Sequence, residues 1–244
     1  GNHVASAWFA RTIPMARPAE LARRRAGDCM PRDITRRDAL FTGLAAAALP
    51  DLAGAQPATA RTPFVPAAEP KDAWLDEVPG KHRILLDVTS PKGMPDGIRF
   101  AGNLFNGHKS GYAVDEKDVV QVLCLRHYAM PFALTDAVWS AHGPALAKIL
   151  NYTDPRGGPP PTANPFNSGE RKQLADLTAR GVRFMVCETA SRSFSRALAG
   201  QGGDADAMFK LFSDNLIPQA RYVSAGVVGV THAQEHGYSL LFVG

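Results

Sequence analysis

The sequence predicts an α/β fold built on a mainly parallel sheet with helices on both of its faces. Five apolar runs, at residues 84–88, 119–125, 182–186, 222–223 and 238–243, are separated by stretches with helical periodicity. The first three runs are continuously apolar rather than alternating, which is typical of strands buried on both faces. Strands that alternate with helices favour a layered structure in which neighbouring strands run parallel.

The stretches between these runs predict the helices. Apolar residues at roughly helical spacing predict a helix over 96–108. Pro131 is expected to open a helix that runs to about His142, because proline suits a first helical turn, and 145–150 is expected to add another turn or two. Ser168 is expected to cap a helix over 169–180, and Asp204 one over 204–215. Two more helices are expected over 188–199 and 226–236.

Residues 30–55 have the pattern of a bacterial twin-arginine signal. Arg36 and Arg37 precede a modest apolar run, and a small-x-small cleavage site ends at Ala55, before Gln56. The run is shorter than the about 20 apolar residues that a bilayer span needs, so no permanent membrane span is expected. The sequence therefore predicts export to the periplasm by the twin-arginine pathway. The alternative is a buried alanine-rich helix after a chance arginine pair.

The rest of the chain divides around this leader. Residues 1–29 show no clear period and are interpreted as an extension ahead of a natural start at Met30. Residues 56–80, rich in alanine and proline, are expected to form a flexible linker, and 81–244 a single domain. Most of the net charge of +4 lies in residues 1–55, so the remainder is nearly neutral. That balance gives no support to nucleic-acid binding.

Two cysteines, Cys124 and Cys187, fall within the expected domain, whereas Cys29 lies ahead of it. Cys187 ends the third apolar run, where a helix is expected to begin. Backbone N–H groups at a helix N-terminus favour a thiolate, which is the form that attacks sulfur. The alternative is a buried, unreactive cysteine. Cys124 lies within a strand and is expected in the core, and the sequence leaves open whether the two pair as a disulfide.

His127 and Arg126 follow the second strand, in LCLRHYAMPFAL. Ligands of parallel α/β sheets gather at the carboxyl ends of strands, so both residues are candidates for an anionic or acid–base site. Arg192, about one helical turn beyond Cys187, could add positive charge. The alternative for His127 is a histidine bonded to loop backbone. No glycine-rich phosphate loop follows any strand, so nothing favours a dinucleotide or nucleoside triphosphate site.

Two further features have a functional and a structural interpretation. His232 and His236 stand four residues apart on the last expected helix, but without a glutamate or a third ligand they indicate metal only weakly, and no metal site is expected. Residues 152–169 are rich in proline, glycine and asparagine. A stretch of this length in a compact domain is usually a functional loop or a lid.

Several phrases in residues 81–244 resemble the DsrE/DsrF-like family of sulfur-relay proteins, which includes TusD-like proteins. GVRFMVCETASRS resembles the segment that places a sulfur-accepting cysteine in that family. A subgroup that often carries twin-arginine leaders is similar in the phrases LRHYAMPFALTDAVW, ANPF, NLIPQARYVSAGVVGVTHAQEHGY and LLFVG. The resemblance implies a flavodoxin-like three-layer α/β/α fold, a tendency to homo-oligomerise, and a sulfur-carrier thiol at Cys187.

The leading hypothesis is an exported sulfur carrier or sulfurtransferase that forms a persulfide on Cys187, with His127 as a second catalytic residue. It needs no cofactor, because the thiolate does the chemistry, and its partner is a sulfur donor or acceptor, either a protein or a small compound. The expected ligand-binding residues are Arg126, Arg192, Tyr128, Pro131, Asn164 and Phe166. One alternative is a non-catalytic ligand-binding or oligomeric interaction module, with the 152–169 loop covering a pocket by His127. The other is a haem or metal protein that uses His127.

Overall fold

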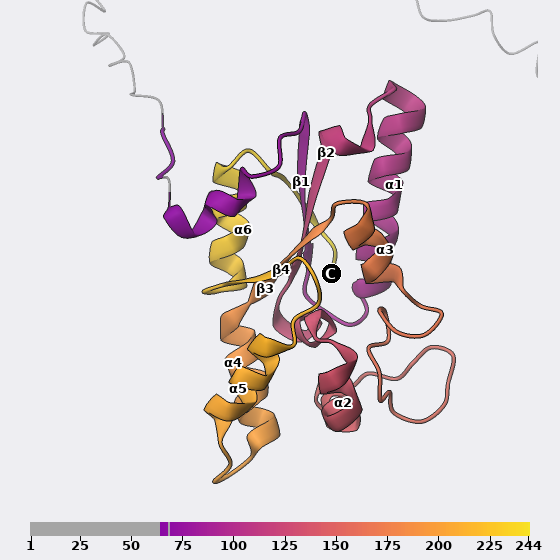
Figure 1. Ribbon diagram of the computed structural model, residues 1–244, viewed down its shortest axis with the longest axis vertical. Coiled ribbons are helices and arrows are strands. Elements are labelled where there is room, and N and C mark those ends of the chain that lie inside the picture. The colour runs from indigo at the N-terminus through magenta and orange to yellow at the C-terminus, as the bar shows by residue number, and fades with distance from the viewer. Residues whose placement is uncertain (1–63, 68) are drawn as a thin grey trace, which may run out of the picture. The chain divides into compact units, whose positions relative to one another are not determined.

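A computed structural model describes residues 64–67 and 69–244. Five parallel strands form one sheet in the order β4-β3-β2-β1-β5 (Figure 1). The strands are β1 (His82–Val88), β2 (Val119–Leu125), β3 (Arg183–Cys187), β4 (Ala220–Val223) and β5 (Ser239–Phe242). Helices cover both faces of this sheet. The expected three-layer α/β/α fold with a five-stranded parallel sheet is confirmed.

Two apolar cores lie on the two faces of the sheet. The larger core packs one face against helices on the α1 side, and its strand residues include Leu86, Leu123 and Phe184. The smaller core packs the other face against α6, through alternate residues such as Leu85 and Met185. Because successive strand residues point to opposite faces, a strand with a core on each side is apolar along most of its length. The helices are α1 (Met94–Tyr112), α2 (Asp136–Leu150), α3 (Gln173–Ala179), α4 (Glu188–Ala199), α5 (Ala205–Asp214) and α6 (Gly226–Glu235).

The expected helix opening at Pro131 is wrong. Residues His127–Ala133 instead form a 3₁₀ segment, η4, and α2 begins at Asp136 and runs unbroken through the expected extra turns at 145–150. The cause is tertiary. Leu134 is extended and forms an antiparallel bridge to Leu216, and the Thr135 N–H donates to the Asn215 carbonyl at 2.9 Å. These contacts hold the chain out of helix until residue 136.

Two other boundaries also differ from expectation. α3 starts at Gln173 after Lys172, so Ser168 does not cap it; Ser168 pairs with Arg171 across a turn in which Gly169 has a φ of +60°. β4 ends rather than begins at residues 222–223, because its pairing with β3 starts at Ala220. The expected cap at Asp204 is confirmed, since its carboxylate accepts the Ala207 N–H at 2.8 Å.

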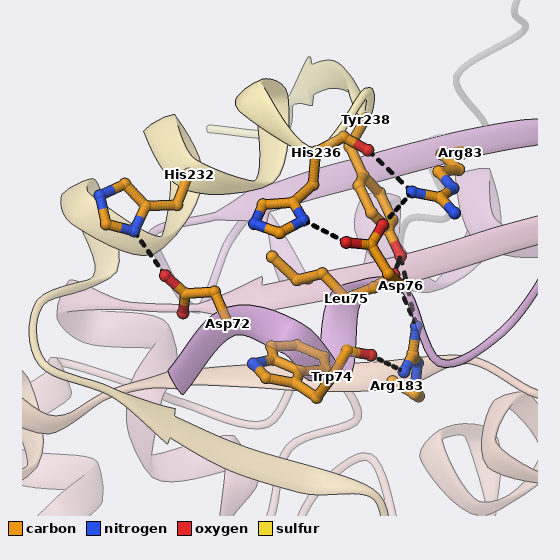
Figure 2. A network of polar contacts seen from close by, with 9 residues as sticks. All are labelled: Asp72, Trp74, Leu75, Asp76, Arg83, Arg183, His232, His236 and Tyr238. Atoms are coloured by element: carbon orange, nitrogen blue, oxygen red, sulfur yellow. Dashed lines mark hydrogen bonds and ion pairs between the residues drawn. The ribbon is translucent and has the colours of Figure 1, made fainter. Parts of the chain in front are cut away.

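Residues 70–76, here called the strap, belong to the folded part of the chain. The expectation of a flexible linker over all of 56–80 is therefore wrong for this segment. Pro70–Leu75 form a 3₁₀ segment, η2, and Trp74 and Leu75 are buried in the core on the α6 face. The Tyr238 hydroxyl donates to the Leu75 carbonyl at 2.7 Å, and the buried Arg183 guanidinium donates to the Trp74 carbonyl (Figure 2). The strap is therefore part of the folded unit. Residues 1–63, which contain the expected extension, the leader and the first eight residues of the expected linker, lie outside the described residues.

Two histidine–carboxylate pairs tie the strap to α6 (Figure 2). His232 Nδ1 lies 2.5 Å from a carboxylate oxygen of Asp72, and His236 Nδ1 lies 2.7 Å from one of Asp76. The two histidines and the two aspartates are each four residues apart, so the pairs match in register. The four-residue spacing of His232 and His236, which indicated a metal site only weakly, thus places both side chains in contact with the strap. The described residues hold no group of three or more His, Cys, Asp or Glu side chains that could bind a metal ion.

The His232–Asp72 pair predicts a pH dependence of stability. The hydrogen bond to Asp72 raises the pKa of His232 above its ordinary value of 6.5, although partial burial opposes the shift. A raised pKa in the folded state means that the pair stabilises the fold fully below pH 6.5 and loses this effect as the pH rises through the raised value. His232→Gln should therefore cost about 0.5–1 kcal/mol at pH 5.5 and almost nothing at pH 9. Urea unfolding at the two pH values measures this, and an equal cost at both would contradict it.

Candidate functional site

A pocket of about 460 Å³ lies at the carboxyl ends of three adjacent strands. The segments that follow β2, β3 and β4 all contribute to it, as does one residue of α2. This is the edge at which parallel α/β sheets bind their ligands. The residues that line it are Arg126, His127, Tyr128, Ile149, Cys187, Thr189, Ala190, Ser193, Phe194, Ala197, Ala225, Gly226 and Val227.

Cys187 lies where β3 passes directly into α4, and it is the N-cap residue of that helix. Its Sγ accepts the Ala190 N–H at 3.3 Å, the position that a serine or aspartate oxygen takes in ordinary caps. The side chain is largely buried, with 7% of the residue exposed, yet it forms part of the pocket wall. The N-terminus of α4 and the donated Ala190 N–H both present positive partial charge to this sulfur.

Arg126 is fixed by a buried carboxylate at the end of β1. Its Nε and Nη2 donate to the two oxygens of Asp87 at 2.7 and 2.8 Å, and Asp87 is 3% exposed. The hydrogen bonds to Asp87 raise the pKa of Arg126, so the guanidinium is charged at any physiological pH. On its other side the stem of Arg126 packs against α6, where a Cβ on Gly226 would lie 2.6 Å from the arginine Cβ. Only glycine fits there.

His127 and Tyr128 form the exposed rim of the pocket beside Arg126. His127 has a φ of +53°, a left-handed conformation that costs a non-glycine residue about 1 kcal/mol or more. The turn is held by backbone bonds to β1 and the loop after it, because the Arg126 and Tyr128 N–H groups donate to the carbonyls of Val88 and Thr89. The His127 and Tyr128 rings meet edge-on with their centroids 4.3 Å apart. This backbone conformation places both rings in the lining of the pocket.

Four of the expected ligand-binding residues lie away from this pocket. The Pro131 carbonyl accepts the Trp139 indole N–H at 3.1 Å, and Phe166 packs edge-on against Phe132 in the larger core. Arg192 pairs with Glu188 at 2.8 Å and lies over the ring of Phe209 on the surface of α4 and α5. The fourth, Asn164, is buried among backbone groups. These contacts are structural.

Asn164 holds the 152–169 loop to the segment before α2. Its side-chain N–H₂ donates to the carbonyls of Phe132 and Leu134, each at 2.8 Å, and its carbonyl accepts the Phe166 N–H at 3.0 Å. The loop itself lines a different pocket, of about 590 Å³, beside the end of β1. It therefore does not cover the pocket at His127, and the expected lid is wrong.

Cys124 is a free cysteine in β2 and is completely buried. Burial raises the pKa of its thiol well above the ordinary value, with a further contribution from the negative charge of Asp87. Both effects keep it protonated. Cys187 is also free, so the two do not form a disulfide. The expectation that Cys124 belongs to the core is confirmed.

Sequence reasoning missed the parts of the pocket that come from α2, α4 and α6. Ile149 could not be found from a local pattern, because α2 reaches the pocket only through tertiary packing. The α4 residues were within reach, since Ala190, Phe194 and Ala197 follow Cys187 at helical spacing. Gly226 and Val227 come three and four residues after the end of β4, so the rule that placed His127 at the carboxyl edge also applied to them.

Comparisons with known proteins assign no function to the chain. No family model and no curated protein matches the chain. A solved structure, that of a protein of unknown function from Methanobacterium thermoautotrophicum, is similar over 66% of this chain and 98% of its own, with 16% identity and a TM-score of 0.39. Within the described residues, no helix is both long enough and apolar enough to cross a membrane.

Proposed function

We propose that Cys187 carries sulfane sulfur as a persulfide, receiving it from one thiol compound and passing it to another. One observation carries the proposal: the Cys187 sulfur caps α4 through the Ala190 N–H while it forms part of the wall of a 460 Å³ pocket. The resemblance of residues 81–244 to DsrE-like sulfur-relay proteins supports the same chemistry. The strained turn at His127 and the fixed guanidinium of Arg126 lie on the same pocket wall.

The transfer step is a thiolate displacement. The Cys187 thiolate attacks the outer sulfur of a donor hydropersulfide, R–S–SH. A bond forms between Sγ and that sulfur as the S–S bond of the donor breaks, and the electron pair of this bond leaves on R–S⁻. The hydropersulfide proton stays with the transferred sulfur, so one thiolate is consumed and one is produced. No external oxidant or cofactor is needed.

The first prediction is that Cys187→Ser abolishes sulfur loading. Purified protein, reduced and then treated with a hydropersulfide, should gain the mass of one sulfur atom in the intact mass spectrum, and digestion should place it on Cys187. Cys124→Ala is the matched control and should load as the unchanged protein does, because burial keeps the Cys124 thiol protonated and out of contact with solvent. Unchanged loading of a folded Cys187→Ser protein would remove the proposal. A retained non-sulfur ligand would then favour the ligand-binding module.

Self-association, which the resemblance implies, is proposed through the free edge of β5. Within the part of the chain that the structure describes, β5 pairs with β1 alone, and all four of its residues are exposed. Its sequence, Ser-Leu-Leu-Phe, lacks the charges and prolines that usually protect an edge strand from pairing. Phe242, 60% exposed, is its most exposed apolar residue.

Phe242→Lys should therefore shift the protein from oligomer to monomer. The charge is placed on an exposed edge residue, so the fold itself should tolerate it. Light scattering after size-exclusion chromatography measures the mass. Val228→Lys, at an exposed valine of α6 away from the edge, is the control and should leave the mass unchanged. A monomeric starting protein, or an oligomer that Phe242→Lys leaves intact, would contradict the proposal.

Export to the periplasm remains part of this proposal. Its support is the twin-arginine pattern over residues 30–55, which lies outside the described residues. A mature chain that begins at Gln56 and is recovered from the periplasm would be the expected product.

A further inference from the structure

The pocket at Cys187 is elongated along one face of α4. Its wall contains Cys187, Ala190, Phe194 and Ala197, which recur every three or four residues and so lie on one side of the helix. Ten residues of helix separate the first from the last, a length of about 15 Å at 1.5 Å per residue. A volume of about 460 Å³ is typical of sites for whole organic molecules and is far more than one sulfur atom occupies.

Beside the polar side chains of Arg126 and His127, the walls that face α4 carry three large, mainly apolar side chains that are exposed to solvent. Tyr128, Ile149 and Val227 belong to the pocket, and they are 44%, 36% and 58% exposed. They come from three different elements, η4, α2 and α6, and all three line the same pocket. A hydrocarbon chain in the pocket would remove this apolar surface from water, which is favourable in proportion to the area covered.

The charges of the pocket leave little to bind a highly charged substrate. Among the described residues that line the pocket, Arg126 is the one lysine or arginine, and none is an aspartate or glutamate. Its charge is already balanced by Asp87, which takes two of its three guanidinium nitrogens. The negative charge of a thiolate on Cys187 would balance the positive partial charge at the N-terminus of α4. A second or third negative charge would find no further lysine or arginine among the described lining residues to receive it.

We infer that the sulfur donor at Cys187 is the hydropersulfide of an elongated, uncharged organic thiol, or that the acceptor is such a thiol, and that its hydrocarbon body lies along α4 with its reacting sulfur at Cys187. This inference rests on the proposed sulfur transfer and names the substrate class for it. Small dianions such as thiosulfate, and thiols with several carboxylates such as glutathione, are disfavoured. Chain length and charge of the substrate decide the rate.

The test is a series of donors with the same reactive group and different bodies. Ethyl, butyl, hexyl and octyl hydropersulfides are compared with glutathione hydropersulfide, and the second-order rate constant for loading Cys187 is read from intact mass. Each added methylene that becomes buried should raise this rate constant up to about fourfold, the effect of burying one CH₂ group. Glutathione hydropersulfide should load more slowly than octyl hydropersulfide. A rate that is flat with chain length, or fastest with glutathione, would overturn the inference.

A pair of variants tests the position of the body. Ala197→Glu places a carboxylate at the far end of the pocket, about 15 Å along α4 from Cys187, and should reduce the octyl-to-ethyl rate ratio at least tenfold. Ala145→Glu introduces the same change at an exposed alanine of α2 outside the pocket and should leave the ratio as it is. An unaltered ratio in Ala197→Glu would also overturn the inference.

A binding measurement separates this inference from the proposed function. Octyl methyl sulfide has no transferable sulfur, and titration calorimetry should show that it binds Cys187→Ser more tightly than ethyl methyl sulfide does. If it does, while no donor loads the unchanged protein, the apolar pocket is supported and sulfur transfer is not. If Cys187 loads but neither rate nor binding depends on chain length, sulfur transfer is supported and the apolar substrate is contradicted.

Discussion

Replacing Arg126 by methionine is expected to lower the free energy of unfolding by about 3–5 kcal/mol, the usual cost of leaving one partner of a buried ion pair without the other. Asp87 is 3% exposed, and both of its carboxylate oxygens accept hydrogen bonds from Arg126. Methionine keeps much of the apolar stem that packs against Gly226 but leaves this carboxylate in the core with no positive partner. Urea unfolding followed by circular dichroism measures the loss.

Two controls make the Arg126 result specific. Arg192→Met removes a partly exposed ion pair with Glu188 and should cost at most about 1 kcal/mol. The double variant Asp87→Leu/Arg126→Met replaces both charges with apolar groups and should recover much of the lost stability, because no buried charge then remains. A loss in Arg126→Met no greater than in Arg192→Met would contradict the view that this pair anchors the pocket.

Replacing Asn164 by alanine is expected to cost at least about 3 kcal/mol. The amide satisfies the carbonyls of Phe132 and Leu134 and the N–H of Phe166, and the residue is 1% exposed. Alanine leaves these three backbone groups buried without partners, and each such group costs about 1–3 kcal/mol when no water can reach it. Because Asn164 is structural, sulfur loading of Cys187 should persist wherever the variant remains folded.

Asn167→Ala is the matched control for Asn164. It removes an amide from the same loop, whose oxygen accepts a single exposed N–H, that of Ala175, at 2.8 Å. Its cost should be about 0.5–1.5 kcal/mol. Equal losses in the two variants, measured by urea unfolding, would show that Asn164 does not have the structural role described for it.

The sheet was predictable because its strands are buried on both faces. The expected runs at 119–125 and 182–186 match β2 fully and β3 to within one residue. The strap was missed because its segment is rich in alanine, proline and charge, and only Trp74 and Leu75 signal burial. Helix starts failed where tertiary contacts override local preference, as at Leu134, which bridges to Leu216 and delays α2.

Part of the candidate site was predictable from the strand assignments alone. The carboxyl ends of parallel strands meet at one edge, so Arg126, His127 and Cys187 could be grouped there. The residues that hold these side chains in place could not be predicted in this way. That Asp87 faces Arg126 depends on the register of β1 against β2, in which it lies beside Cys124. Asn164 follows a proline-rich loop and looked like a ligand contact, and only the packed structure shows that it binds backbone groups.

Mass spectrometry of the protein isolated from the periplasm of its own host tests the central claim most directly. Thiols are blocked at lysis, the chain is digested, and the Cys187 and Cys124 peptides are compared with and without reductant. We expect one extra sulfur on Cys187 that reductant removes, an unmodified Cys124, and a mature chain beginning at Gln56. An unmodified Cys187 thiol that also fails to accept sulfur from any hydropersulfide would contradict it.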